Sequence, residues 1–543
     1  MKEMIVVGSG IAGLSCACYA AQCGIQVTLL SPFIPERSQS VMAAGGINGA
    51  LDNMGEQDSI ALHVEETMRG GCNIENRDAV QALCADAVDI IRALDSLGVC
   101  FSRTQNGEIA QRAFGGQSKR RTAFAGASTG KQIVTALVRK LREYQVSGRV
   151  HFLTGYRFLT AFIDGGECFG GLFLNETKNI CEPFLADAMV LATGGQNRIF
   201  GKTTGSTLCD GSAAAQLFMQ GVTLRNLEFI QYHPTTIDAP GKRMLISEAA
   251  RGDGGRLFYL KGGVRCYFME EKYGRSGNLM PRDIVSKEIY DAPSQVFLDI
   301  SFLDPAFIDE RLSEIQAVCR DYLGLNVCKV PIPVYPSVHF FMGGIAVDLH
   351  HQTNIKRLYA IGECASLYHG ANRLGGNSLL AAMHSAKAAV ENILSLDHAE
   401  CKPAQRARFE VLANDETKKI CRMTASQSKF PSIFILKELA RIMNDDLGIT
   451  RTEQKLRSGI AELDFYLDAV RHMAFDGTIS LYEVYALPGM LTLAKAITLS
   501  ALERKESRGA HIRSDYPNQN PDLACATFVR YHDGHITVKH GEA

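Results

Sequence analysis

The most informative absences in this sequence are closely spaced cysteines, excess charge and long apolar runs. Although the 543-residue chain has 16 Cys, no two have the C-x-x-C spacing of iron–sulfur and structural zinc sites, and Cys16 and Cys18 are the closest pair. No metal site is therefore expected, and the cysteines are interpreted as reduced cytosolic thiols. The formal net charge of -1 does not point to nucleic acid or to an anionic membrane surface.

No segment is typical of a targeting signal or a membrane-spanning helix. Residues 1–13 have the pattern of a strand that runs into a glycine turn, not of a signal peptide. No uninterrupted apolar run reaches about 18 residues. We therefore expect a cytoplasmic protein with no membrane span of its own, which could dock peripherally at the inner face of the cytoplasmic membrane through a partner. The length predicts two or three domains.

The first thirty residues have the pattern of a dinucleotide-binding unit. An apolar strand at 4–7 is followed by G-S-G-I-A-G at 8–13, a helix-compatible stretch at 14–22 and a second apolar strand at 26–30. Glycines in such a turn let the backbone approach a pyrophosphate, and the helix N-terminus offers amide donors. The second strand runs into Ser31, where an Asp or Glu usually holds the ribose of NAD, so NAD is disfavoured.

Two later strand ends favour FAD. Residues 188–195 (AMVLATGG) and 358–363 (LYAIGE) each have the pattern of a buried strand followed by a glycine turn. Strand ends of this kind gather at the ligand crevice of a doubly wound sheet, where Glu363 could bind ribityl or ribose hydroxyls. The alternative interpretation is that Glu363 only caps a helix.

Eight further motifs follow in order along the chain. They are SQSVMAAGGIN at 38–48, FGG at 114–116, QYHPT at 231–235, SEAARG at 247–252, PRD at 281–283, HFFMGG at 339–344, HGANRLGGNSL at 369–379 and ESRGAH at 506–511. With the glycine turn, they resemble the flavoprotein subunits of succinate dehydrogenase and fumarate reductase, whose sister branch is L-aspartate oxidase. The resemblance extends from Gly8 to about Pro517.

The resemblance implies an α/β fold in which a Rossmann-like FAD-binding domain is interrupted by an α+β capping domain and followed by a helical C-terminal domain. The expected boundaries are 1–225 and 343–400 for the FAD-binding domain, 226–342 for the capping domain, 401–516 for the helical domain and 517–543 for a tail. The apolar spacing at 434–443 predicts an amphipathic helix. Asp533-Gly534 predicts a hairpin turn in the tail.

The implied reaction, reduction of fumarate to succinate or its reverse, sets chemical requirements. Fumarate needs clamps for two carboxylates, a hydride from reduced flavin and an acid on the other face, and Arg and His donors suit the carboxylates. By resemblance, Arg282 delivers the proton. Glu248, with Arg251 nearby, belongs to the relay that supplies protons to Arg282. The residues that match the carboxylate-binding positions are His233, Ser247, His339 and Arg373. Taken singly, Arg282 could be a surface ion pair and His339 a core histidine.

Phe114 favours fumarate or succinate over aspartate as the substrate. The aspartate oxidase branch carries Glu at the matching position, where it can meet the substrate ammonium, whereas Phe suits an uncharged carbon chain. The alternative function is an L-aspartate oxidase that makes iminoaspartate for NAD biosynthesis. A third hypothesis, a non-enzymatic assembly subunit, is disfavoured because the resemblance keeps the set of candidate site residues intact.

Gln39 stands where many respiratory members carry the histidine that links FAD covalently. Because a carboxamide cannot form that bond, we predict non-covalent FAD. In the family the covalent link raises the flavin potential and supports succinate oxidation, so its absence favours fumarate reduction. The other expected FAD contacts are Gly8, Ser9, Gly10 and Gly13 at the pyrophosphate, Ser31 at the ribose, Ser38, Ser40, Gly45 and Gly46 along the flavin, and Thr193, Gly194, Asp210, Glu363, Ser378 and Leu379. Because no ligands for an iron–sulfur cluster are expected in this chain, its electrons are expected to come from a partner. That partner is either an iron–sulfur subunit or a soluble thiol- or flavin-linked donor.

Overall fold

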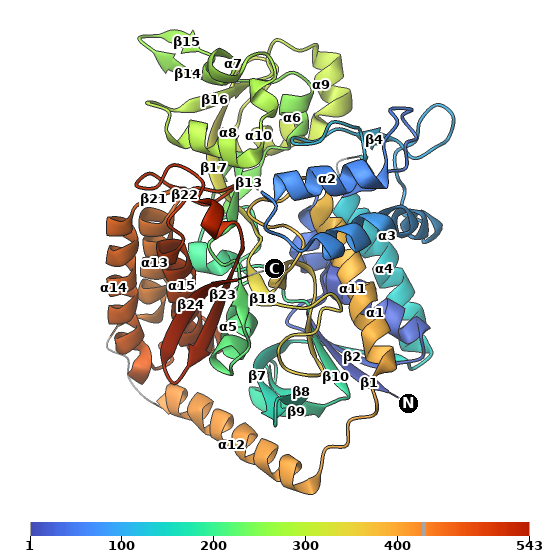
Figure 1. The fold of residues 1–543 in the computed structure, drawn as a ribbon, viewed down its shortest axis with the longest axis vertical. Helices are drawn as coiled ribbons and strands as arrows, with labels where there is room; N and C mark the ends of the chain where they lie inside the picture. The colour runs from blue at the N-terminus through green and yellow to red at the C-terminus, as the bar shows by residue number, and fades with distance from the viewer. Residues whose placement is uncertain (1, 127, 426–429, 542–543) are drawn as a thin grey trace.

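The computed structural model describes residues 2–126, 128–425 and 430–541, and Figure 1 shows how they are arranged. A parallel sheet of order β19-β10-β1-β2-β6 lies beside the N-terminus. Its strands are β1 (Glu3–Val7), β2 (Gln26–Ser31), β6 (Val150–Thr154), β10 (Ala188–Leu191) and β19 (Leu358–Ala360). The apolar runs of β1 and β10 are buried, as expected for strands covered on both faces.

Helices and a second sheet cover the parallel sheet. Helix α1 packs against α4 and α11, while β8 contacts β10 and β7 contacts β2. The covering elements are α1 (Ile11–Gln22), α3 (Arg77–Ser96), α4 (Thr129–Val146), α11 (Asn377–Ser395), β7 (Tyr156–Asp164), β8 (Glu167–Asn175) and β9 (Ile180–Leu185). Near them lie α2 (Ile60–Gly70), α5 (Ser212–Met219) and a small sheet of β3 (Ile47–Asn48), β4 (Gln111–Arg112) and β5 (Thr122–Ala123). This arrangement confirms the predicted Rossmann-like α/β fold.

A second unit stands at the top of Figure 1 and has its own hydrophobic core, drawn from residues 237–334. Its sheet has the order β13-β12-β17-β16-β14-β15. The strands are β12 (Ile230–Ala239), β13 (Lys242–Leu245), β14 (Arg256–Lys261), β15 (Val264–Cys266), β16 (Val296–Asp299) and β17 (Ile332–Phe341). The helices are α6 (Ala249–Gly252), α7 (Phe268–Tyr273), α8 (Arg282–Tyr290), α9 (Pro305–Arg311) and α10 (Ser313–Leu323). This α+β unit matches the capping domain expected at 226–342, whose exact boundaries stay a prediction.

The chain enters and leaves this cap through two strands of a mixed sheet. The order is β20-β18-β11-β23-β24, with β11 (Leu224–Arg225), β18 (Gly344–Ala346), β20 (Ala365–Ser366), β23 (Ala526–His532) and β24 (His535–Gly541). The two connections touch, because a Cβ on Gly343 would lie 2.2 Å from the backbone oxygen of Asn226. The predicted tail hairpin is confirmed: β23 and β24 are joined at Asp533 (φ 47°) and Gly534 (φ 83°), the positive angles of a type I′ turn.

Helices form most of the C-terminal region that the structure describes, and they confirm the helical segment expected there. They are α12 (Pro403–Ala425), α13 (Ser432–Ile442), α14 (Glu453–Ala469) and α15 (Leu481–Glu503), with β21 (Thr450–Arg451) and β22 (Ile512–Arg513) pairing beside them. Helix α15 is long and apolar enough to cross a membrane, with a mean hydropathy of 1.3, but 83% of its apolar window is buried inside the protein. It therefore serves as the core helix of this region.

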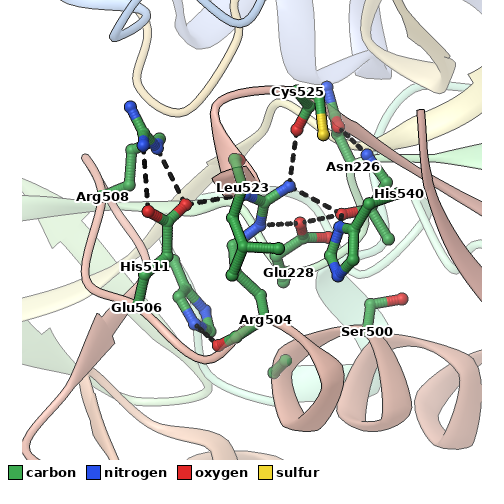
Figure 2. Close-up of polar contacts among 12 residues, drawn as sticks. Asn226, Glu228, Ser500, Arg504, Glu506, Arg508, His511, Leu523, Cys525 and His540 are labelled. Carbon is green, nitrogen blue, oxygen red and sulfur yellow. Dashed lines mark hydrogen bonds and ion pairs between the residues drawn. The ribbon is translucent and has the colours of Figure 1, made fainter. Parts of the chain in front are cut away.

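A fully buried ionic network joins the cap connection to the C-terminal elements (Figure 2). Nε of Arg504 donates to Glu228 across 2.6 Å, and its Nη1 donates to Glu506 across 2.7 Å. Arg508 also binds Glu506, at 2.8 Å, and Nη2 of Arg504 donates to the backbone oxygen of Cys525 across 2.8 Å. Because Glu228 lies just before β12, the network fixes the start of the cap to the end of α15 and to the segment before β23.

Candidate active site

One large cavity runs from the carboxyl edge of the parallel sheet to the underside of the cap. All the site residues predicted from the sequence line it except Gly13 and Arg251, and Gln39 lines it too. The lining residues come from the glycine turn, from the segment after β2, from the end of β10 and from β13, β17 and α11. The fold thus brings segments hundreds of residues apart to one crevice, at the edge of a doubly wound sheet where ligands bind.

The glycine turn is shaped for close approach of a ligand to backbone. Gly8 has φ 106°, and a Cβ there would lie 2.4 Å from the backbone oxygen of Ala192. Gly13 does not face the cavity but lets α1 pack against the turn, because a Cβ on it would lie 1.9 Å from the oxygen of Gly8. Helix α1 begins at Ile11, so its N-terminus lies at the cavity, as binding of a pyrophosphate requires, and the Ile11 amide donates to Oγ of Ser40 across 3.0 Å.

Hydroxyl groups replace the carboxylate that usually ends the second strand. Oγ of Ser9 and Oγ of Ser31 lie 2.8 Å apart, and Ser9 also donates to the backbone oxygen of Phe33 across 3.1 Å. Both serines are buried and line the cavity. Neutral hydroxyls thus stand where a carboxylate usually binds the ribose, in keeping with the sequence argument against NAD.

Polar atoms around the middle of the cavity lack protein partners. Among the described residues, Oγ of Ser38 and Oε1 of Gln39 are buried without a hydrogen bond, while Nε2 of Gln39 donates to the backbone oxygen of Thr204 across 3.4 Å. Buried polar atoms without partners are rare in folded proteins unless a ligand or water binds them. Together with the glycine turn, these atoms fit a bound dinucleotide such as FAD.

Two carboxylates sit farther along the same cavity. Glu363 lies in the 3-10 turn Gly362–Cys364 after β19 and accepts a hydrogen bond from the backbone N–H of Phe341 across 3.1 Å. Burial raises the pKa of Glu363 to about 7. Burial also raises the pKa of Asp210, which accepts from the amide of Ser212 across 2.9 Å. Glu363 thus does not merely cap a helix, and both groups can meet hydroxyls of a ligand.

The far end of the cavity, under the cap, holds a carboxylate between two arginines. Nε of Arg282 donates to Oε1 of Glu248 across 2.8 Å, and Nη2 of Arg251 donates to the same oxygen across 3.3 Å. Nη1 of Arg251 donates to the backbone oxygen of Asn278 across 2.6 Å. Burial alone would raise the pKa of Glu248, but the charges of Arg282 and Arg251 lower it to about 2. Glu248 is therefore ionised at neutral pH, with Arg251 behind it and Arg282 in front.

Two histidines face each other across this end of the cavity. The rings of His233 on β12 and His339 on β17 lie 5.2 Å apart at 63°, and Nδ1 of His339 is 2.8 Å from Oγ1 of Thr204. Burial, and then the charge of Arg282, lower the pKa of both histidines well below the usual 6.5. They are neutral at physiological pH and can each offer one N–H to an anion.

Arg373 supplies a second guanidinium from the loop before α11. It is 5% exposed, its Cζ lies 4.3 Å from the ring centre of Phe340, and its Nε has no hydrogen bond to the described residues. Burial, and then the charge of Arg282, lower the pKa of Arg373 to about 9, so it remains cationic at neutral pH. Ser247 lines the same end.

Phe114 forms an aromatic wall of the cavity. A Cβ on Gly45 would lie 3.2 Å from its ring, and one on Gly375 would lie 2.9 Å from it. The ring is 8% exposed and lines the cavity. Because the ring packs on two glycine backbones, this position contributes apolar surface and no charge.

Three residues that the sequence analysis did not assign also lie at the site. Gln231 bonds to Arg282 and Arg373, and Thr204 contacts His339. Lys242, at the start of β13, lines the cavity and forms no ion pair with the described part of the chain. A signal existed for Gln231, because residues two apart on a strand share a face and it precedes His233 by two. No such signal marked Thr204 or Lys242.

Comparisons with known proteins agree with this geometry. Residues 3–379 match the family model of the FAD binding domain, and residues 436–540 match that of the fumarate reductase flavoprotein C-term. The chain is 38% identical to the succinate dehydrogenase flavoprotein subunit of Bacillus subtilis, over 98% of this chain and 94% of that protein. It is 33% identical to the fumarate reductase flavoprotein subunit of Mycobacterium tuberculosis, over 99% of this chain and 96% of that protein.

Solved structures show the same likeness. A variant of the Escherichia coli quinol fumarate reductase FrdA superposes with a TM-score of 0.92 at 28% identity, over all of this chain and 96% of that one. Mycobacterium smegmatis Sdh1 in complex with UQ1 gives a TM-score of 0.87 at 28% identity, over 100% of this chain and 94% of that one. The predicted family is thereby confirmed, and the alternative of L-aspartate oxidase is not supported. The chain belongs to the succinate dehydrogenase and fumarate reductase flavoprotein family of FAD-dependent oxidoreductases.

Proposed function

We propose that this chain is the catalytic flavoprotein subunit of an enzyme that reduces fumarate to succinate. The observation that carries the proposal is the Arg282–Glu248–Arg251 group, which lies at the end of a cavity suited to FAD and beside a second guanidinium, Arg373. A flat C4 dianion would meet cations and neutral donors there. The carboxylate of Glu248 is already paired with arginines and so does not repel the substrate.

Four residues hold the two substrate carboxylates between them. Arg373 binds through its guanidinium, Ser247 offers a hydroxyl, and His233 and His339 each present one N–H. Because both histidines are neutral, they bind the anion by hydrogen bonding rather than by charge. Phe114 lies along the carbon chain and offers no partner for an ammonium group, which favours fumarate over aspartate.

The cap supplies the acid. FAD, when bound in its reduced form along the glycine turn and the segment after β2, would supply the hydride for one alkene carbon. Arg282 gives a proton to the other alkene carbon, and the product is succinate. The ionised Glu248 takes a proton from Arg251 and passes it to the deprotonated Arg282, and Arg251 regains its proton from solvent. A positioned general acid of this kind contributes about 10²- to 10⁴-fold to rate.

FAD is held without a covalent bond. Gln39 lines the cavity where a linking histidine would stand, and its carboxamide cannot form the bond. Acid precipitation should release all the flavin into the supernatant, and the denatured chain should show no flavin fluorescence on a gel. Fluorescence that stays with the denatured chain would contradict this part of the proposal.

The electron donor is a partner subunit. The part of the chain that the structure describes has no cluster of three or more His, Cys, Asp or Glu side chains that could hold a metal. We propose an iron–sulfur subunit as the donor and a peripheral place at the inner face of the cytoplasmic membrane through that partner. Copurification of an iron-containing chain from native cells would support the partner, and a flavoprotein that always isolates alone would argue against it.

Steady-state turnover tests the proposed reaction. Purified flavin-loaded protein is assayed without oxygen using reduced viologen and fumarate, and in parallel with aspartate and oxygen. Viologen oxidation that depends on fumarate and yields succinate, with no turnover of aspartate, is the expected result. Turnover of aspartate to hydrogen peroxide would instead assign the site to amino-acid oxidation.

A further inference from the structure

Gln231 makes four hydrogen bonds around the two arginines of the pocket. Its Oε1 accepts from Nη1 of Arg282 across 2.9 Å and from Nη2 of Arg373 across 3.0 Å. Its Nε2 donates to the backbone oxygen of Arg373 across 2.8 Å and to Oδ1 of Asn372 across 2.7 Å. The side chain is 1% exposed. Both ends of the carboxamide are used, so its orientation is fixed with the oxygen towards the arginines.

The chain of hydrogen bonds continues back into the cap. Nδ2 of Asn372 donates to Oδ1 of Asp283 across 2.9 Å, and Asp283 directly follows Arg282 at the start of α8. Arg282 belongs to the cap, whereas Arg373 and Asn372 belong to the loop before α11. Gln231, at the start of β12, therefore stands where the two units meet and contacts both.

A neutral oxygen is the suitable acceptor between two cations. The two guanidiniums repel each other, and the charge of Arg282, after burial, contributes to the lowered pKa of Arg373. A carboxylate at position 231 would cancel positive charge that a dicarboxylate substrate needs, and Glu248 already pairs with Arg282 at Nε. A carboxamide binds both arginines and leaves their charge in place.

The bonds of Gln231 also determine which atom of Arg282 remains available. Nε is bound to Glu248 and Nη1 to Gln231. Nη2 makes no hydrogen bond to the residues that the structure describes. Two bonds from one planar guanidinium fix its plane and leave Nη2 as the nitrogen available to a ligand in the cavity that Arg282 lines.

We propose that Gln231 is a positioning residue that sets the separation and orientation of the proton-donating Arg282 and the carboxylate-binding Arg373. The inference rests on the proposed function and adds a residue to which the sequence motifs assigned no role. Gln231 does not touch the reacting atoms in this account. It acts by holding the two arginines in place. Because Arg282 belongs to the cap and Arg373 to the loop before α11, Gln231 couples the position of the cap to the geometry of the substrate-binding residues.

The test compares two buried glutamines. Gln231→Met keeps the approximate volume and removes every hydrogen bond of the carboxamide. Gln111→Met is the matched control: Gln111 is 4% exposed and donates to the backbone oxygens of Gly49 and Arg121 at 2.7 Å each, but it does not line the cavity. Both variants are assayed as flavin-loaded protein with reduced viologen and fumarate, with rates normalised to bound flavin.

We expect Gln231→Met to lower kcat by about 100-fold, the loss that a misplaced catalytic group causes, and to raise KM for fumarate because Arg373 is also released. Gln111→Met should keep both constants within about twofold of wild type. A merely structural role for Gln231 would instead lower the midpoint of thermal unfolding in both variants and leave kcat and KM per bound flavin unchanged.

A second variant at position 231 distinguishes the effect of where the two arginines lie from the effect of the charge beside them. Gln231→Glu keeps an acceptor oxygen for both arginines but adds a negative charge, which stabilises the protonated guanidinium of Arg282 and makes it a weaker acid. We expect a lower kcat, a higher KM for fumarate, and a pH–rate profile whose basic limb moves to higher pH. This variant also provides the test if Gln231→Met does not fold.

The outcomes distinguish the two proposals. If wild type fails to oxidise viologen with fumarate, the proposed function is wrong and the role of Gln231 is wrong with it. If wild type turns over and the Gln231 variants keep wild-type kcat, KM and pH profile, only the inference about Gln231 is overturned.

Discussion

Nε of Arg282 lies 2.8 Å from Oε1 of Glu248, so the cap places its arginine in direct contact with a carboxylate that is ionised at neutral pH. The same oxygen also accepts from Arg251. This contact connects α8 to the segment after β13 and joins two separate sequence motifs in one hydrogen-bonded unit, to which we assign the proton transfer. Three features determine how the protein should respond to substitution and to pH. They are that unit, the histidines beside it and the ionic network that anchors the cap.

Replacing Arg282 by Lys should displace the acid from its position while keeping a positive charge. The shorter ammonium cannot bind Glu248 and Gln231 together, so we expect kcat for fumarate reduction to fall about 10³-fold. The dissociation constant of malonate, a dicarboxylate that cannot be reduced, should change much less, as measured by perturbation of the flavin spectrum. Arg320→Lys, on the exposed surface of α10, is the control. A kcat close to wild type would remove Arg282 from the acid role.

Glu248→Gln should show a pH-dependent loss of stability. The pKa of Glu248 is lowered from 4.5 to about 2, so its ionised form stabilises the fold above pH 4.5 and this contribution is lost as the pH falls towards 2. At pH 7, Gln leaves two buried arginines without their counter-ion and should cost about 3 kcal/mol. Thermal unfolding midpoints at pH 7 and pH 3 measure the difference.

The difference in thermal unfolding midpoint between wild type and Glu248→Gln should be smaller at pH 3 than at pH 7. Glu310→Gln, at an exposed position of α9, controls for general effects of removing a carboxylate. A gap of equal size at both pH values would mean that the charge of Glu248 does not support the fold. The same variant should also lower kcat, because the relay loses its proton acceptor.

His233 and His339 should add no pH dependence to dicarboxylate affinity between about 6.5 and 8. Burial and Arg282 lower the pKa of His233 and His339 well below 6.5, so both stay neutral over this range. Glu363, in the same cavity, has a pKa raised by burial to about 7, so Glu363→Gln serves as the background for the test. Malonate titrations of the oxidised enzyme at several pH values measure the affinity directly. A tenfold change in affinity centred near pH 6.5 that persists in Glu363→Gln would show that one histidine binds the substrate as a cation.

Arg504→Met should destabilise the protein although it lies outside the cavity. The substitution leaves Glu228 buried without its arginine and Glu506 with Arg508 alone, and breaking a buried pair costs about 3 to 5 kcal/mol. Arg530→Met, at an exposed position of β23, is the matched control. A drop in the thermal midpoint confined to Arg504→Met is expected. Equal midpoints for the two variants would show that the network in Figure 2 does not anchor the cap.

The parallel sheet, the interrupted domain order and most of the cavity lining could be predicted from the sequence, because these follow from local patterns and ordered motifs. The glycine turn and the strand end before Gly194 each have a short-range signature. Gln231 shows the limit of such reasoning. Its place two residues before His233 puts it on the same strand face, but its role depends on contacts with Arg282 and Arg373, which lie 51 and 142 positions away, and no local pattern encodes those contacts.

The C-terminal region shows a second limit. Its helices could be predicted from apolar spacing, but not that Arg504 and Glu228 would form a buried pair across 276 positions. Buried ion pairs of this kind depend on how separate elements pack, and single-sequence patterns carry no information about that packing. The contact between Thr204 and His339, 135 positions apart, escapes prediction for the same reason.

A single turnover of the reduced enzyme tests the central claim most directly. Flavin-loaded protein is reduced photochemically without oxygen and mixed with one equivalent of fumarate, while the absorbance of oxidised flavin near 450 nm is followed. The account predicts rapid return of the oxidised spectrum with about one succinate formed per flavin, and a much slower return in Arg282→Lys. A flavin that stays reduced in the presence of fumarate, and reoxidises only when oxygen is admitted, would contradict it.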